Sequence, residues 1–414
     1  MTGEWPDLDT VRSWDASDPL RDRRARFALP QGMIYLDGNS LGALPRATAD
    51  RIADTVTRQW GRDLISSWNK NGWIDAPARL GARIAPLIGA AADEVIVADS
   101  TSVNLFKLLA AACAARPDRG TILTEPGNFP TDLYVANGVA QMMPDRRVRT
   151  MAAEEIAAAI DADTAVVLLT HVHYKTGAML DMAAITAAAH RAGALILWDL
   201  SHSAGAVDVD LNGCGVDLAI GCGYKYLNGG PGAPAFLFVA RSVQETLSSP
   251  LSGWMGHAAP FDFGDDYAPA PGIRRFLCGT PPILAMSALD AGLDTFGETG
   301  MAQLVAKSRA LGDLLIAGIE ARCVRHGFSL VTPRDPAARG SHVSIAHPHA
   351  WEICQALIAR GVVGDFRAPD VLRLGLTPLY TSFEDVWQAV ELLAAVMEEG
   401  AWRDPAFAAR AAVT

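Results

Sequence analysis

The sequence predicts an α/β protein whose large domain is built on a mainly parallel sheet with helices on both faces. Between residues 94 and 240, short apolar runs alternate with segments of helical spacing, and each apolar run ends in polar residues. Short apolar runs are typical of buried strands, and their alternation with helices is typical of parallel sheets. Because the chain has 414 residues, it is long enough for two or three domains.

The first 60 residues are expected to hold helices and one short strand. Residues 1–30 indicate short helical pieces that end at Pro30, and residues 35–42 indicate a brief strand running into a glycine-bounded loop. Residues 47–60 are predicted to form a helix, because apolar residues recur there on one helical face.

Three tryptophans, Trp60, Trp68 and Trp73, follow one another at the end of this helix and beyond it. Aromatic side chains dominate both protein cores and dimer interfaces, so packing in one of these settings is the preferred interpretation. An aromatic substrate pocket could instead use Trp68 or Trp73, and the sequence does not decide between them.

Six short strands are predicted for the large domain, at residues 94–98, 121–124, 165–169, 194–198, 217–223 and 235–240. A long helix from about residue 300 then leads to a smaller α+β unit in the C-terminal third. Its strands are predicted near 328–332, 341–346 and 371–376, and its helices at 350–360 and 382–398.

Two predicted strand exits bring an acid and an amine to one edge of the large sheet. Asp199 follows the strand at 194–198, and Tyr224 and Lys225 follow the strand at 217–223. Ligands of open α/β sheets lie outside the carboxyl ends of the strands. This arrangement suits pyridoxal phosphate (PLP), because a lysine amine binds its aldehyde and a carboxylate keeps its pyridine nitrogen protonated. The strand context and the following glycine loop disfavour the alternative of a helix-capping aspartate and a solvated lysine.

Two further positions have both a structural and a functional interpretation. Residues 99–102 open a helix that runs to about Arg116, and their hydroxyl groups are N-caps whose free N–H groups also suit a phosphate. Arg373 lies among apolar residues of a predicted strand, so it needs an anionic partner, and an internal salt bridge would satisfy it.

Composition disfavours several classes of protein. The formal net charge is −11 without a block rich in Lys or Arg, which disfavours nucleic acid as a partner. Apolar runs stay short of the ~18 residues that a membrane span needs, and the first residues lack the apolar core of a signal peptide. The six cysteines show no CxxC pair, so they are interpreted as reduced and buried in a cytoplasmic protein.

No metal site is predicted. His171 and His173 would share one face of a strand, but no third cluster of ligands accompanies them, and the same holds for His347 and His349.

The chain resembles the kynureninase family, whose members are PLP-dependent enzymes of fold type I. The resemblance rests on stretches in family order: YLDGNSLGALP (35–45), TSVNL (101–105), FPTD (129–132), DLSHSAGAVDVDL (199–211), YKYLNGGPG (224–232), GTPPIL (279–284) and RLGLTPLYTSFEDV (373–386). It implies a large, mainly parallel seven-stranded sheet domain at 61–300, with residues 235–240 antiparallel, and a smaller α+β domain at 301–414. Residues 1–60 would pack with the small domain.

The resemblance also implies an activity. This is the hydrolysis of L-kynurenine, or of its 3-hydroxy form, to anthranilate or 3-hydroxyanthranilate and L-alanine, in tryptophan catabolism. The implied enzyme is a cytoplasmic homodimer that binds PLP and shares its active site between subunits.

Residue roles follow from the same resemblance. The implied catalytic residues are Lys225, Tyr224, Asp199, Arg373 and Ser40, with Arg373 holding the substrate α-carboxylate and Ser40 near the substrate. The implied cofactor-binding residues are Thr101, Ser102, Phe129, Pro130, Thr131, Asp132, Thr170, Asp199, His202, Tyr224, Lys225, Trp254 and Thr280. Among them, Thr101 and Ser102 would bind the phosphate, Phe129 would stack on the ring, and Trp254 and Thr280 would reach the cofactor of the neighbouring subunit.

Two other interpretations stay open at this point. One is another enzyme of the same fold type, such as a class V aminotransferase or a cysteine desulfurase. A desulfurase needs a reactive cysteine on a mobile loop, whereas the cysteines here lie mostly in predicted elements. The other is a PLP-binding protein without turnover, which the joint presence of Lys225, Asp199, Tyr224 and Arg373 disfavours.

Overall fold

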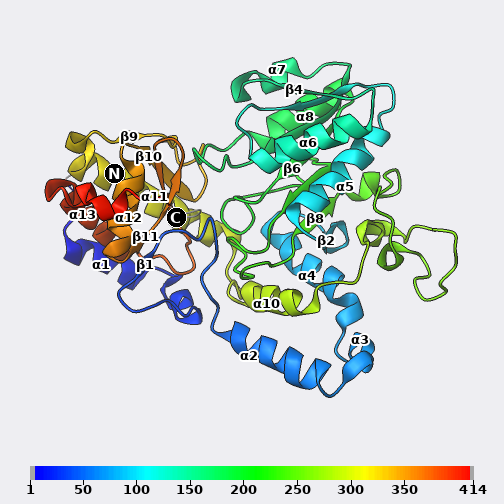
Figure 1. The fold of residues 1–414 in the computed structure, drawn as a ribbon, viewed down its shortest axis with the longest axis horizontal. Coiled ribbons are helices and arrows are strands. Elements are labelled where there is room, and N and C mark those ends of the chain that lie inside the picture. The colour runs from blue at the N-terminus through cyan, green and yellow to red at the C-terminus, as the bar shows by residue number, and fades with distance from the viewer. Residues whose placement is uncertain (1–4, 411–414) are drawn as a thin grey trace.

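Seven strands form the central sheet of the structure, a computed structural model that describes residues 5–410 (Figure 1). In spatial order they are β2 (Val95–Val97), β8 (Phe236–Val239), β7 (Leu218–Gly221), β6 (Leu195–Asp199), β5 (Thr164–Thr170), β3 (Thr121–Thr124) and β4 (Arg147–Thr150). Strand β8 runs antiparallel to both of its neighbours, and the other pairs are parallel. The predicted seven-stranded, mainly parallel sheet is confirmed, as is the antiparallel strand within 235–240.

Helices cover both faces of this sheet, and the apolar strands are built for that position. Along β5, Val166 and Leu168 face one core, while Val167 and Leu169 face the other, because successive side chains of a strand point to opposite faces. The first core is shared with α5 (Thr101–Ala114) and α6 (Pro130–Met142). The second is shared with α4 (Ala76–Ile84), α8 (Met182–Ala192) and α10 (Ile283–Asp294).

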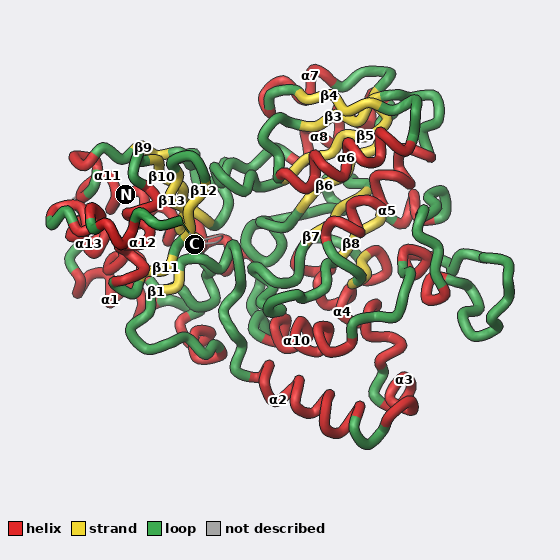
Figure 2. Tube along the Cα trace, viewed as in Figure 1, coloured by secondary structure: helices red, strands yellow, loops and turns green. Residues whose placement is uncertain are grey.

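A smaller unit lies beside the large one and has its own apolar core (Figure 2). Its antiparallel sheet has the order β12 (Asp365–Arg367), β13 (Val371–Gly375), β10 (His342–Ala346) and β9 (Ser329–Leu330). Its helices are α1 (Leu8–Ser17), α11 (Met301–Arg322), α12 (Ala350–Ala359) and α13 (Phe383–Glu398).

Both ends of the described chain meet in this unit. Strand β1 (Ile34–Tyr35) pairs in parallel with β11 (Val362–Val363), and α1 packs on α13, where the rings of Trp5 and Trp387 stack. The large sheet is therefore inserted between two segments of chain that complete one small unit.

The predicted helix at 47–60 forms, but its second half has a different winding. Helix α2 (Ala47–Asp54) packs on α10 and continues as a π-helix at Thr55–Trp60. The hydroxyls of Thr55 and Thr57 donate to the carbonyls of Arg51 and Ala53, four residues earlier. These bonds compete with the ordinary helical pattern, which is a known way to loosen a turn.

Shorter elements connect the rest. They are α3 (Ser67–Lys70), α7 (Ile156–Ala159), α9 (Arg241–Gln244) and the 3-10 turns Arg21–Arg26, Leu64–Ser66, Trp73–Asp75, Ala85–Leu87, Ala92–Glu94, Ala153–Glu155, Trp254–Gly256, Gly272–Phe276, Val324–His326, Ala401–Arg403 and Pro405–Phe407. Within residues 5–410, no helix is both long enough and apolar enough to cross a bilayer.

Candidate functional site

A cavity of about 690 Å³ opens at the carboxyl ends of β5, β6 and β7. It collects most of the residues that the sequence analysis singled out. Its lining consists of Asp99, Ser100, Thr101, Ser102, Phe129, Thr131, Asp132, Thr170, Tyr174, Asp199, Ser201, His202, Tyr224, Lys225, Gly232, Ala233, Pro234, Thr280 and Pro282.

Two carboxyl groups lie at the floor of the cavity. Asp199 ends β6 and is paired in register with Thr170 of β5, whose hydroxyl is 3.4 Å from Oδ2 of Asp132. Burial raises the pKa of both carboxyls, and the adjacent Asp199 raises that of Asp132 further. The Asp199 carboxylate accepts a hydrogen bond from the backbone N–H of Ser201 at 2.7 Å, which favours its charged form. Of the two carboxyl groups, Asp132 is therefore the one that is protonated and neutral, and Asp199 is the one that is ionised.

The amine of Lys225 lies in the same cavity. Its Nζ is 3.4 Å from Nε2 of His202, and it is 5.9 Å and 5.7 Å from the ring centres of Phe129 and Tyr224. Burial lowers the pKa of His202 well below its usual range, and the Lys225 charge acts in the same direction. The imidazole is thus neutral beside the amine. Burial raises the pKa of Tyr224, so its phenol stays protonated and can donate a hydrogen bond.

Another part of the cavity wall is built from the start of α5. Ser100 caps this helix by accepting from the N–H of Val103, and the hydroxyl residues Thr101 and Ser102 occupy its first turn. The free N–H groups and hydroxyls of a helix N-terminus form a suitable site for a phosphate.

The loop at 37–42 closes against the Lys225 segment. The N–H of Gly42 donates to the carbonyl of Tyr224 at 2.8 Å. A Cβ at position 42 would lie 2.4 Å from the carbonyl oxygen of Lys225 and 2.8 Å from Cα of Asn228. Only glycine allows so close an approach of the two backbones.

Arg373 and Ser40 lie together, outside the cavity lining. Arg373 is bound to Asp365 in a buried ion pair, and Nη2 of Arg373 donates to the hydroxyl of Ser40 at 2.9 Å. The internal salt bridge considered for Arg373 from the sequence is therefore present. Its Nη1 donates to the carbonyl of Tyr174, which itself lines the cavity, so the ion pair adjoins the cavity wall.

The remaining candidate residues differ in their relation to the cavity, which Thr280 lines and Pro130 and Trp254 do not. Pro130 begins α6 beside Phe129, and Trp254 is 36% exposed and packs on Phe261. Thr280 lines this chain's own cavity, so its reach toward a neighbouring subunit stays a prediction. Trp68 and Trp73 pack edge to face with ring centres 5.9 Å apart, and neither lines the cavity.

His171 and His173 form hydrogen bonds with other groups of the same chain. A ring nitrogen of His171 is 3.0 Å from the hydroxyl of Ser203, and one of His173 is 2.9 Å from the carbonyl of Gly127.

Several residues of the site were not identified from the sequence, among them Ser201, Tyr174 and Asn128. Ser201 stands between Asp199 and His202 in the quoted DLSHS stretch, which was a signal for it. Tyr174 packs edge to face on Phe129 and follows directly after the His-x-His pair. Asn128 accepts from the Thr170 hydroxyl and precedes the FPTD stretch, where it passed for part of a turn.

The donor set fits PLP. It combines a lysine amine, a buried carboxylate, an aromatic ring and a helix N-terminus for a phosphate around one cavity. Lys225 would bind the aldehyde, Asp199 the ring nitrogen, and Thr101 and Ser102 the phosphate.

Comparisons with known proteins agree on family and cofactor. Residues 304–393 match the model of the kynureninase C-terminal domain, and residues 68–217 match that of the DegT/DnrJ/EryC1/StrS aminotransferase family. The chain is 54% identical to a kynureninase of Burkholderia mallei (strain SAVP1) over 406 residues, which are 97% of this chain and 98% of that one. It is 52% identical to a kynureninase of Pseudomonas fluorescens, with the same coverage.

Solved structures share the fold at low identity. A cysteine desulfurase from Thermococcus onnurineus NA1 matches with a TM-score of 0.76 and 18% identity, covering 91% of this chain and 98% of the desulfurase. A form of C-DES with glycine covalently linked to its PLP cofactor matches with a TM-score of 0.77 and 18% identity, covering 90% and 98%. The PLP-dependent fold of type I is thereby confirmed.

Proposed function

Because this chain belongs to the kynureninase family, we propose that the cavity lined by Lys225 and Asp199 is its active site. Its activity is the PLP-dependent hydrolysis of L-kynurenine, or of 3-hydroxy-L-kynurenine, to anthranilate or 3-hydroxyanthranilate and L-alanine. One observation carries the site assignment: an amine and a buried carboxylate converge on one cavity from the exits of adjacent parallel strands.

PLP, when bound, supplies an aldehyde for amines and a ring that withdraws electrons from the substrate α-carbon. Lys225 would hold the cofactor through its amine, and the same Nζ would serve as the general base for the α-proton. Asp199 keeps a proton on the ring nitrogen, and the neutral Asp132 beside it adds no second negative charge. The protonated phenol of Tyr224 would donate to the phosphate and relay protons, and His202 would support the phosphate side.

Substrate binding involves the second group of residues. Arg373 binds the α-carboxylate, and Ser40 lies with it at that end of the substrate. Phe129 covers the ring from one side, with Tyr174 packed edge to face on it. The Cβ–Cγ bond breaks once water adds to the γ-carbonyl, so the active site must admit one water molecule to the ketone.

Incubation of the purified protein with L-kynurenine tests the activity. We expect anthranilate fluorescence together with one equivalent of L-alanine, and absence of anthranilate would contradict the hydrolase function. The variant Lys225→Ala is expected to lose both turnover and the visible absorbance of the covalently held cofactor. If that absorbance persisted unchanged, the assignment of Lys225 would be wrong.

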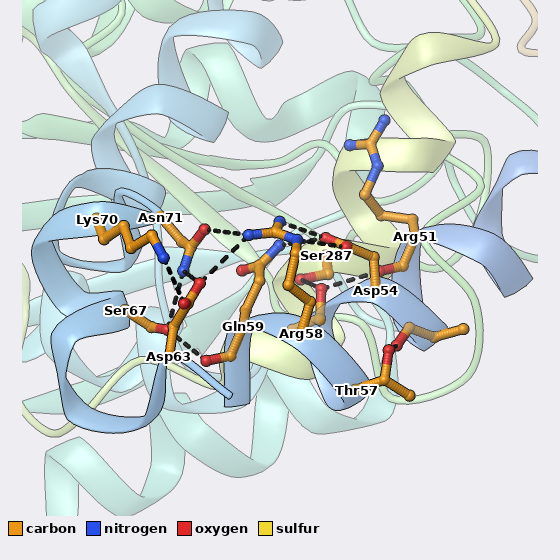
Figure 3. A network of polar contacts seen from close by, with 12 residues as sticks. Arg51, Asp54, Thr57, Arg58, Gln59, Asp63, Ser67, Lys70, Asn71 and Ser287 are labelled. Carbon is orange, nitrogen blue, oxygen red and sulfur yellow. Dashed lines mark hydrogen bonds and ion pairs between the residues drawn. The ribbon is translucent and has the colours of Figure 1, made fainter. Parts of the chain in front are cut away.

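We also infer that the enzyme is a homodimer, with the arm of residues 47–75 in the interface. This arm exposes Val56, Trp60, Leu64 and Ile65, with Leu64 60% and Ile65 80% exposed. Figure 3 shows that polar contacts nevertheless hold the arm in one shape, among them Arg58 with Asp54 at 2.7 Å and Asn71 with Asp63 at 3.0 Å. A rigid segment with clustered apolar side chains is suited to bind a second copy of the chain.

Light scattering on the holoenzyme tests the dimer. Ile65→Asp is expected to yield monomers, while Val324→Asp, which changes an apolar residue of the small unit that is 61% exposed, is expected to leave the mass unchanged. Equal masses for both variants and the parent protein would exclude this interface. A shared active site further predicts that mixing Lys225→Ala with Trp254→Ala subunits restores activity that neither variant has alone.

Cytoplasmic localisation is part of the proposal, supported by the six cysteines, which are all free.

A further inference from the structure

Asp365 lies directly opposite Arg373 on the neighbouring antiparallel strands β12 and β13. Residues opposite each other in such a pair share one face of the sheet. Both side chains are almost fully buried, with 2% and 1% exposed. Asp365 Oδ1 accepts from Nε at 2.8 Å, and Oδ2 accepts from Nη2, so the contact is bidentate. Asp365 therefore fixes the plane of the Arg373 guanidinium.

Further contacts of Arg373 leave one of its N–H hydrogens without an acceptor in the described part of the chain. Ser40 accepts from Nη2 of Arg373 and donates to Oδ2 of Asp365 at 2.7 Å, while the Tyr174 carbonyl accepts from Nη1. A guanidinium has five N–H hydrogens, and four of them are directed at Asp365, Ser40 and the Tyr174 carbonyl. The side-chain oxygen of Asn39 also accepts from Nε at 2.9 Å and from Nη2 at 3.1 Å, so it supports the same edge of the guanidinium. The fifth hydrogen, on Nη1, has no acceptor among residues 5–410. It belongs to the nitrogen that is bound to Tyr174, a residue of the cavity wall.

A second arginine changes the charge of the cluster. Nη2 of Arg367 is 2.7 Å from Oδ2 of Asp365, so one carboxylate faces two guanidinium groups. Asp37 is a further acid that interacts with this cluster. Its pKa is raised to about 7, mainly by burial and secondly by the charge of Asp365. Burial therefore favours the protonated, neutral form of Asp37. The cluster keeps an excess of positive charge that a ligand carboxylate can neutralise.

We propose that Asp365 is a positioning residue for substrate selection: it holds Arg373 so that Nη1 meets the α-carboxylate, while Arg367 supplies the charge that Asp365 would otherwise cancel. This inference rests on the proposed function, in which Arg373 binds that carboxylate.

Charge and positioning predict opposite results when Asp365 is replaced. Asp365→Asn removes a negative charge, which alone would strengthen the binding of an anion. It also breaks the bidentate contact that orients the guanidinium, which would weaken binding by an oriented donor. A weaker preference for carboxylates in this variant therefore identifies positioning.

The experiment compares two small ligands of the holoenzyme that differ only in the carboxylate. L-Alanine, the reaction product, and ethylamine are titrated at one pH, and their dissociation constants are taken from the change in visible absorbance. The preference is the ratio of the two constants. Cofactor content per chain is measured for every variant.

We expect the parent enzyme to prefer L-alanine and Asp365→Asn to lose about tenfold or more of that preference, with ethylamine binding and cofactor content unchanged. Arg367→Gln keeps the Arg373–Asp365 pair and is expected to weaken L-alanine binding through charge alone. The control is Asp18→Asn, which breaks another buried ion pair of the small unit, that of Asp18 with Lys307. It should leave the preference unchanged.

The outcomes distinguish carboxylate binding by Arg373 from the positioning of Arg373 by Asp365. A parent enzyme without preference for L-alanine would contradict carboxylate binding by Arg373 itself. If the parent enzyme prefers L-alanine and Asp365→Asn keeps this preference within about twofold, the positioning role of Asp365 is overturned. If Asp365→Asn does not fold, Ser40→Ala decides, since it removes only the hydroxyl that joins Asp365 to Arg373. A several-fold lower preference supports the proposal, and an unchanged one overturns it.

Discussion

Asp132 and Asp199 show how burial divides two like residues into different roles. Both carboxyls are nearly inaccessible to water, and two negative charges so close together would repel each other strongly. The proton that Asp132 prefers to hold leaves a single buried anion, on Asp199, to face the ring nitrogen of PLP. Local contacts decide which of the two carboxyl groups is ionised, because the Ser201 N–H donates to Asp199.

His171 gives a pH prediction for a single residue. Burial lowers its pKa to about 4, below the ordinary value near 6.5. The unfolded chain therefore binds a proton that the folded chain refuses between about pH 6.5 and 4, so the stability contribution of neutral His171 is lost as the pH falls through this window. The full effect is about 3 kcal/mol.

His171→Gln removes this group and keeps a side chain that can bond to Ser203. We expect urea unfolding to show a smaller loss of stability between pH 7.5 and 4.5 for the variant than for the parent. The remaining loss reflects other buried histidines, such as His202. An identical loss in both proteins would count against a buried, neutral His171.

At the scale of elements, the apolar strands of the large sheet were predictable, and the polar strands β4 and β12 were not. The strand β5 is buried on both faces and is continuously apolar from Ala165 to Leu169, whereas β4 is an edge strand that reads Arg-Val-Arg-Thr. Strand β12 was missed for a similar reason, since Asp365 and Arg367 are charged residues in a three-residue strand. Charges occur in these strands because one lies at a sheet edge and the other carries the ion pair with Arg373.

One carboxylate attaches α2 and α4 to α10. Asp290 of α10 forms ion pairs with Arg51 at 2.7 Å, with Arg79 at 3.1 Å and with Arg83, and its side chain is only 12% exposed. Asp290→Ala would leave three guanidinium groups without this anion. We expect the free energy of unfolding to fall by about 3 kcal/mol.

Chemical denaturation measures this loss. The matched control is Asp93→Ala, which removes an ion pair with Arg241 whose carboxylate side chain is 60% exposed, and it should cost less than about 1 kcal/mol. Equal losses in the two variants would show that Asp290 does not act as a junction between helices.

On the scale of the whole molecule, the cavity could be predicted but its link to the small unit could not. Asp199 and Lys225 follow strands that any parallel sheet brings to one edge, so their meeting follows from local patterns. The partner of Arg373 depends on the register between β12 and β13, which no local pattern reveals. Ser40 joins them from a loop more than 300 residues earlier in the chain.

Contact between the two units predicts a role for Gly42. A methyl group there would press on the backbone of Lys225, so Gly42→Ala should push the loop at 37–42 away from the lysine. We expect cofactor affinity to fall about tenfold, measured by PLP titration of the apoenzyme, with a stability loss of about 1–3 kcal/mol. Gly138→Ala, in α6 with open space around it, should change neither quantity. Unaltered PLP affinity in Gly42→Ala would mean that the loop does not support the lysine.

The pairing of β1 with β11 has a consequence during synthesis on the ribosome. Translation releases β1, which ends at Tyr35, long before its partner, which begins at Val362. The large sheet can fold in the meantime, while the early segment waits with an unpaired strand and an uncovered α1. A message that stops before β11 would therefore yield a nascent protein whose beginning, as well as its end, is left without a partner and open to proteases.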